Sequence, residues 1–84
     1  MRGYKRSMIK IAVVDSGLDS EHSFWGNCLK EFYDVNTGGV EKKEIPEDLN
    51  GHGTACAYII NRCIQEYELY IYRVFDENLA ANTE

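Results

Sequence analysis

Proline, positive charge and long apolar runs are all scarce in this chain of 84 residues. No apolar run approaches the roughly 18–20 residues of a membrane span, so we expect no membrane partner. The net charge of −5 argues against nucleic-acid binding, which needs a basic patch, and the only basic cluster lies within residues 2–10. No signal-peptide core follows the charged start, which predicts a cytoplasmic protein.

Cysteine is also sparse, and its number is odd. Cys28, Cys56 and Cys63 form no CxxC pair, and without a secretion signal they are expected to be free thiols. Their spacing to the two histidines matches no usual zinc pattern, so the sequence predicts neither a metal site nor a cofactor. A chain of this length forms at most one small domain, and such domains are only marginally stable.

The apolar pattern predicts an α/β fold. The run Met8–Val14 is β-branched with little alternation, as in a strand buried on both faces of a parallel sheet. Glycine, proline and charge gather in residues 36–51, which predicts a surface loop with room for a hairpin. The other expected segments are a frayed terminus (1–7), a short strand (29–35), a helix (54–64), and a central strand (69–75). The helix would serve as a right-handed crossover between parallel strands, and the charge runs 41–44 and 47–48 would be solvated.

Asp15 follows the first predicted strand, in the turn sequence Asp15-Ser16-Gly17. Open α/β sheets place their active sites at the carboxyl ends of strands. A carboxylate there can accept a hydrogen bond from an imidazole, fix its tautomer and stabilise its charged form. An aspartate after a strand can equally well do no more than cap the turn, so this motif alone decides little.

His52 lies between two glycines at the start of the predicted helix, in the string Gly51-His52-Gly53-Thr54. We expect the glycines to let the backbone pass close to other segments. Thr54 is expected to cap or back-bond the first helical turn. A histidine in such a setting is a candidate general base.

Taken together, the strings Ile11-Ala12-Val13-Val14-Asp15-Ser16-Gly17-Leu18-Asp19 and Gly51-His52-Gly53-Thr54-Ala55-Cys56-Ala57 resemble the subtilisin-like serine proteases, the subtilases. The chain order of aspartate, histidine and then serine is the one known for subtilisin. The resemblance covers roughly residues 10–76. It implies that residues 1–84 are the N-terminal part of a subtilisin-like catalytic domain with a mainly parallel sheet, incomplete by itself.

The resemblance implies a role for each matching residue. Asp15 would orient the imidazole, and His52 would act as general base and then as general acid. Asn50 would support the histidine loop. Cys56 stands where the thiol-containing members carry a cysteine beneath the histidine, although a small buried apolar residue is the simpler interpretation. The expected activity is that of a serine endopeptidase acting on a peptide or protein substrate.

The chain also departs from the family pattern. The nucleophilic serine and the oxyanion asparagine are absent, and Ser7, Ser16, Ser20 and Ser23 lack the context of a nucleophile. Tyr58 stands where many members have glycine. Phe24 occupies the approximate place of a calcium-binding aspartate, so calcium is not expected at that site.

These departures predict that a companion C-terminal fragment of the same protease supplies the serine. Autoproteolytic cleavage after Glu84 is one way in which the two fragments could arise. The main alternative is a subtilase-like module that only binds other molecules. A second alternative is an unrelated α/β domain in which Asp15 binds metal or phosphate.

Overall fold

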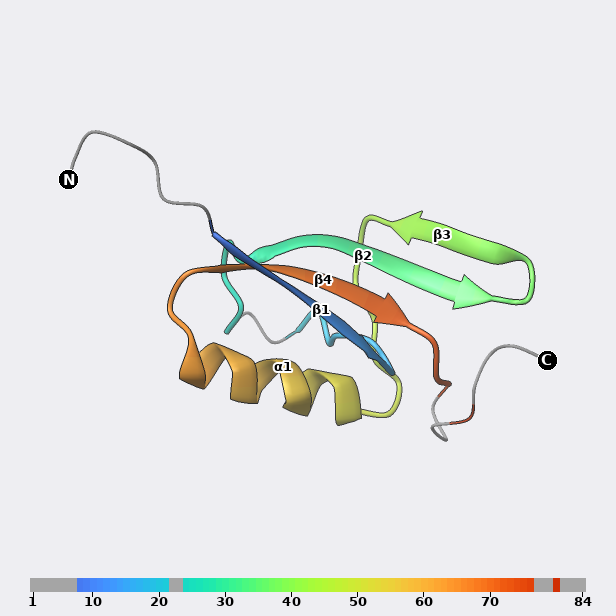
Figure 1. Cartoon of the computed structure of the whole chain (residues 1–84). Helices are drawn as coiled ribbons and strands as arrows, with labels where there is room; N and C mark the ends of the chain where they lie inside the picture. Colours follow the sequence, from blue (N-terminus) through green and yellow to red (C-terminus); the bar gives the residue numbers. More distant parts are fainter. Residues whose placement is uncertain (1–7, 22–23, 77–79, 81–84) are drawn as a thin grey trace.

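The computed structural model describes residues 8–21, 24–76 and 80. Its elements, in chain order, are β1 (Ile9–Asp15), β2 (Leu29–Asn36), β3 (Gly39–Lys43), α1 (His52–Cys63) and β4 (Tyr67–Arg73). They form a four-stranded sheet in the order β1-β4-β2-β3, with α1 lying against one face (Figure 1). The expected frayed terminus, residues 1–7, lies outside the described residues.

The last strand in the chain is central in the sheet. β4 pairs in parallel with β1 on one side and with β2 on the other. Its sequence, with three tyrosines, one leucine and one isoleucine among seven residues, suits a strand with neighbours on both sides. The predicted α/β class, the mainly parallel sheet and the central position of this strand are therefore confirmed. β4 begins at Tyr67, two residues earlier than expected.

The predicted loop 36–51 contains a strand. β3 turns back from β2 at Gly39, whose φ of 129° suits glycine, and pairs with β2 in antiparallel fashion. All five residues of β3 are exposed, and this includes most of the charge run 41–44, as expected. Later in the loop, Pro46 is buried and Asp48 is half-buried, so the segment is not surface throughout.

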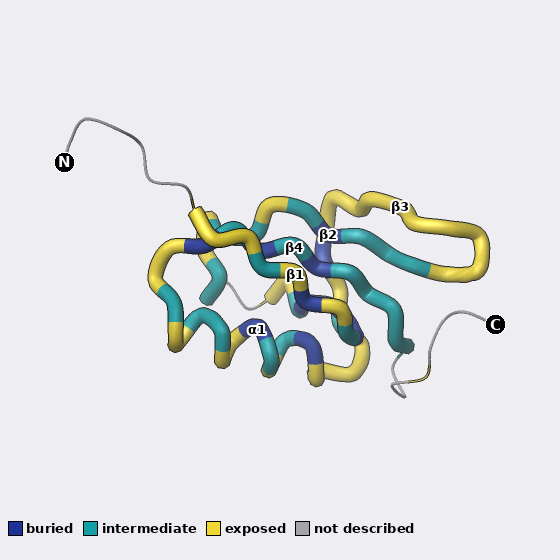
Figure 2. The backbone as a smooth tube through the Cα atoms, in the orientation of Figure 1, coloured by how far each residue is buried: buried dark blue, intermediate teal, exposed yellow. Residues whose placement is uncertain are grey.

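The core lies between the sheet and α1 (Figure 2). Ala57 is fully buried, and Ile60 and Ile64 pack against the core from the same side of the helix, as their spacing predicted. The helix begins at His52, two residues earlier than expected. The buried apolar residues of the core are Val13, Leu18, Phe32, Ala57, Tyr67, Leu69 and Ile71.

The prediction that the first strand is buried on both faces is wrong. Val13 points toward α1 and is 7% exposed, whereas Val14, on the opposite face, is 58% exposed. The reason is that α1 is the only helix among the described residues and covers one face only. On the uncovered face the rings of Tyr33 and Tyr72 stack, with centroids 4.9 Å apart.

Candidate active site

Asp15 is the last residue of β1, and the sheet fixes its position. Its carbonyl oxygen accepts hydrogen bonds from the backbone N–H groups of Val74 (2.8 Å) and Phe75 (3.2 Å), which directly follow β4. Its side chain is 13% exposed. The carboxylate thus lies at the carboxyl edge of two parallel strands, where α/β sheets commonly hold their active sites.

The turn after Asp15 is tied to the loop before α1. Gly17 has a φ of 124°, and a Cβ atom there would lie 1.9 Å from the carbonyl oxygen of Glu47. The N–H of Leu18 donates to that same oxygen over 3.1 Å. Glycine is required at position 17 because the two backbone segments touch at this point.

Ser16 links this turn to the helix. The residue is only 1% exposed. Its hydroxyl donates a hydrogen bond to Asp48 Oδ1 (2.8 Å) and accepts one from the N–H of Gly53 (2.9 Å). The hydroxyl is therefore engaged in structural contacts. Its placement agrees with the sequence-based view that Ser16 is no nucleophile.

Glycine is favoured on the two sides of His52 for different reasons. A Cβ atom on Gly53 would lie 2.4 Å from the carbonyl oxygen of Gly17, so the helix meets the turn here with no room for a side chain. A Cβ atom on Gly51 would meet nothing within 4 Å, and this glycine instead takes a φ of 101° as the residue before the helix. The expected close approach is confirmed for Gly53 and wrong for Gly51.

The helix N-terminus is satisfied by side chains from outside the helix. Asn50 Oδ1 accepts from the N–H of His52 (3.0 Å), which bears out the expectation that Asn50 supports this loop. Ser16 accepts from Gly53, and Asp48 Oδ2 accepts from the N–H of Thr54 (2.9 Å). Together these contacts satisfy the first backbone donors, which a helix leaves without partners.

Thr54 does not cap the helix, contrary to the prediction. Its hydroxyl donates to Asp48 Oδ2 over 2.6 Å and accepts from the N–H of Asp19 over 2.8 Å. The physical reason is that Asp48 already serves the Thr54 N–H. Thr54 instead connects the helix to the segment that follows the Asp15 turn.

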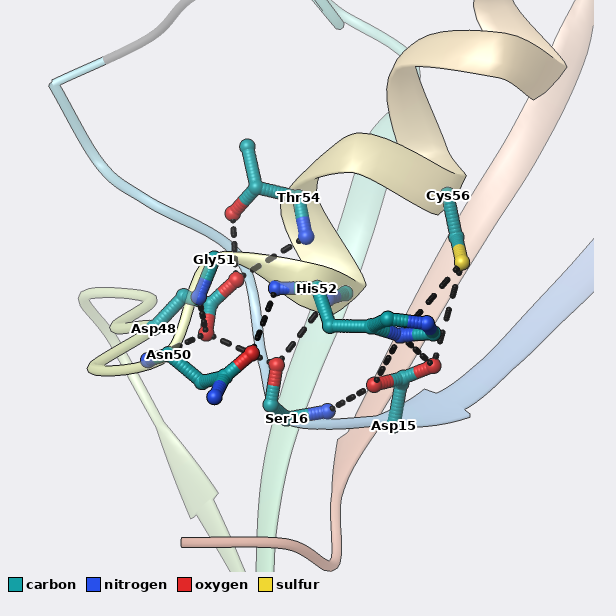
Figure 3. Close-up of polar contacts among 9 residues, drawn as sticks. Asp15, Ser16, Asp48, Asn50, Gly51, His52, Thr54 and Cys56 are labelled. Atoms are coloured by element: carbon teal, nitrogen blue, oxygen red, sulfur yellow. Dashed lines mark hydrogen bonds and ion pairs between the residues drawn. The ribbon is translucent and has the colours of Figure 1, made fainter. Parts of the chain in front are cut away.

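Asp48 is the central residue that sequence reasoning missed (Figure 3). Besides Ser16 and Thr54, it accepts hydrogen bonds from the backbone N–H groups of Asn50 (3.1 Å) and Gly51 (2.8 Å). The prediction of a solvated charge at this position is therefore wrong. An aspartate four residues before the histidine, in a turn sequence, was the only available signal.

The hydrogen bonds of Asp48 also set its ionisation. Burial by itself raises the pKa of this carboxyl, but donors from Thr54, Gly51 and Ser16 outweigh burial and hold the pKa below its usual value. Asp48 is therefore an anion at neutral pH. It holds the Asp15 turn and the helix start to one another.

Asp15 and His52 lie in direct contact. The Nδ1 atom of the imidazole is 3.0 Å from Asp15 Oδ1 and 2.9 Å from Oδ2, while the N–H of Ser16 donates to Oδ1 over 2.7 Å. The His52 side chain is 55% exposed. Within the described residues, no group hydrogen-bonds the second ring nitrogen, Nε2. The two residues that the sequence singled out are thus brought together across 37 positions of chain.

Cys56 lies one helical turn after His52 and faces the same pair. Its sulfur is 3.7 Å from His52 Nδ1 and 3.8 Å from Asp15 Oδ2. Burial and the negative charge of Asp15 raise the pKa of this thiol. Cys56 is therefore protonated at neutral pH and lacks the activation of a nucleophilic cysteine. It is half-buried, less than a core residue would be.

A charged pocket adjoins the site on the side of β2. It measures about 340 Å³ and is lined in part by Ser16, Asp34, Glu47 and Arg73. Arg73 binds both carboxylate oxygens of Asp34, at 3.1 and 2.8 Å, and reaches Glu47 at 3.0 Å. The guanidinium group holds the pKa of Asp34 below its ordinary value. This pair connects the ends of β2 and β4 beside Asp15.

A comparison with protein families matches residues 6–80 to the subtilase family. The chain belongs to the subtilase family. Comparison with curated proteins and with solved structures gives no match. The predicted family is thus confirmed over nearly the whole chain, and the matched range contains both Asp15 and His52. The interpretation as an unrelated α/β domain is set aside.

The two residues come from different elements that meet at the carboxyl edge of the sheet. Asp15 comes from β1 and His52 from the start of α1, and Asp48, in the loop before α1, bonds to Ser16 beside the one and to Thr54 beside the other (Figure 3). None of the helices in the described ranges is long and apolar enough to cross a membrane.

Proposed function

We propose that this chain supplies the aspartate and histidine of an Asp-His-Ser triad in a subtilisin-type serine endopeptidase. The supporting observation is the hydrogen bond between His52 Nδ1 and the Asp15 carboxylate, at 2.9–3.0 Å. Among the described residues, Nε2 has no hydrogen-bond partner. In such a triad the aspartate fixes the tautomer, and Nε2 receives the proton of the serine.

The chemistry follows from this tautomer. With its proton on Nδ1, held by Asp15, His52 presents a lone pair at Nε2. The serine oxygen attacks the peptide carbonyl while Nε2 takes the hydroxyl proton, and the carboxylate stabilises the imidazolium that forms. His52 then gives this proton to the leaving amine. Water repeats the cycle on the acyl-enzyme, and no cofactor or calcium ion is needed for these steps.

The serine and the oxyanion donors would come from another segment, either continuous with this chain or on a companion polypeptide held without a covalent bond. The sheet face away from α1 supports a companion, because it leaves Val14 of β1 58% exposed. Apolar surface of this kind is normally covered in a folded protein. We further propose a cytoplasmic location, which suits the three free thiols.

A serine-directed fluorophosphonate tests the proposal in the native protein. Intact-mass analysis, under conditions that keep polypeptides together, should find the adduct on a serine outside residues 1–84. Asp15→Asn should lower kcat by about 10⁴-fold, as a lost tautomer does elsewhere. Glu44→Gln, on the exposed part of the loop, is the matched control and should leave both readouts unchanged.

Two results would contradict this function. One is a folded complex that binds peptide but takes up no probe, which would indicate a subtilase-like module that serves only in binding. The other is full labelling of the Asp15→Asn variant, because the serine would then be activated without the pair described above. A probe adduct on a separate polypeptide would identify the companion.

A further inference from the structure

Three potential metal ligands of different chemistry meet at the Asp15–His52 pair. They are a carboxylate oxygen of Asp15, Nδ1 of His52 and the sulfur of Cys56, and all lie within 4.8 Å of one another. His52 and Cys56 are four residues apart on α1, which places them on the same face of the helix. The carboxylate comes from β1, so only the tertiary fold assembles the set.

The spacing of these donors is close to that around a tetrahedral zinc ion. Bonds of about 2.0–2.2 Å to nitrogen and oxygen and about 2.3 Å to sulfur imply donor separations of roughly 3.4–3.6 Å. The observed separations are 2.9 Å for nitrogen to oxygen, 3.7 Å for sulfur to nitrogen and 3.8 Å for sulfur to oxygen. Side-chain movements of about half an ångström therefore complete the geometry.

The donor set also selects the ion. Thiolate and imidazole favour zinc or cadmium, whereas calcium and magnesium require oxygen ligands. Since the His52 side chain is 55% exposed, water can take a fourth position. We propose that Asp15, His52 and Cys56 form a site for one thiophilic divalent cation, zinc or cadmium. Occupation of this site would stop His52 from acting as a general base.

The proton balance explains the inhibition. The ion takes the Nδ1 lone pair, so the ring proton moves from Nδ1 to Nε2, and Cys56 releases its thiol proton to solvent as it binds. Nε2 then carries a proton and cannot accept one from a serine. This regulatory step rests on the proposed function, whereas binding of the ion does not.

Binding is tested with Co²⁺ as a spectroscopic probe on the reduced native protein. We expect one ion per chain, a thiolate-to-cobalt charge-transfer band, and displacement by Zn²⁺. Cys56→Ser should abolish the band and weaken Zn²⁺ binding by at least about 100-fold. Loss of a residue that only hydrogen-bonds to a metal ligand already lowers metal affinity by about 10–100-fold, and loss of a ligand should lower it further. Cys63→Ser, on the exposed end of the same helix, is the matched control and should retain the band.

A second measurement needs no variant. Zn²⁺ should slow alkylation of Cys56 in the wild-type protein, read by peptide mass, and leave that of Cys63 unchanged. A band that survives Cys56→Ser, or protection of both cysteines alike, would overturn the site. Inhibition by Zn²⁺ that persists in an active Cys56→Ser variant would overturn the switch. If the metal-free protein had no peptidase activity, the proposed function would be contradicted and the metal site would not, because the cobalt band and the alkylation rates measure metal binding without peptidase activity.

Discussion

Gly53→Ala tests the contact on which the whole site depends. The added Cβ atom would lie 2.4 Å from the carbonyl oxygen and 2.9 Å from the nitrogen of Gly17, whereas ordinary contacts begin near 3.4 Å. Both obstacles are backbone atoms, so no side chain can move aside. The start of α1 must withdraw by about 1 Å, which stretches the bond from Gly53 N–H to Ser16 and the contact between His52 and Asp15.

The change in the free energy of unfolding combines one stabilising effect with two destabilising ones. Alanine is favoured over glycine in a helix by up to about 1 kcal/mol. Overpacking costs about 1–3 kcal/mol, and the strained hydrogen bond to Ser16 costs about 0.5–1.5 kcal/mol. We therefore expect Gly53→Ala to lower the free energy of unfolding by about 1–3 kcal/mol. In an active protein kcat should fall about 10²-fold, as for other misplacements of about 1 Å.

Urea unfolding gives the stability, and Ala55→Gly is the matched control. Ala55 is exposed on the same helical turn, so its replacement reports helix propensity alone and should cost about 1 kcal/mol. If Gly53→Ala were neutral or stabilising while Ala55→Gly lost the expected amount, the close approach of helix and turn would be refuted. An unchanged kcat would refute the link between this contact and the Asp15–His52 pair.

Two further predictions concern the carboxylates around the site. Asp48→Ala removes the acceptor for several helix and loop donors and should cost about 2–3 kcal/mol in urea unfolding, with faster amide exchange at Thr54; the exposed Glu44→Ala should stay within about 0.5 kcal/mol. Asp34, whose pKa is depressed by Arg73, stabilises the fold above the unfolded value of about 3.9, and this contribution is lost as the pH falls through the folded pKa. Asp34→Asn should therefore flatten the acid limb of the stability curve, and an unaltered acid limb would show that the pair contributes nothing.

The sequence by itself determined the fold class and the two motifs. A β-branched run, a glycine-flanked histidine and a second strong strand suffice to predict a parallel α/β sheet, because strand and helix periodicity are local properties. The identity of Asp15 and His52 followed from the residue strings around them. Their contact is the expected consequence of a strand end and a helix start meeting at one sheet edge.

Only the tertiary structure decided the rest. Asp48 reads as one more charge in a polar loop, and its importance arises from donors that lie up to 32 residues away in the chain. The same holds for the grouping of Cys56 with Asp15, which sit 41 residues apart. The exposed face of β1 is a further case, since a run of apolar residues records what a strand can bury, and the elements packed around it decide which side is covered. Long-range packing and hydrogen bonding fix these features, and neither leaves a periodic signal in the sequence.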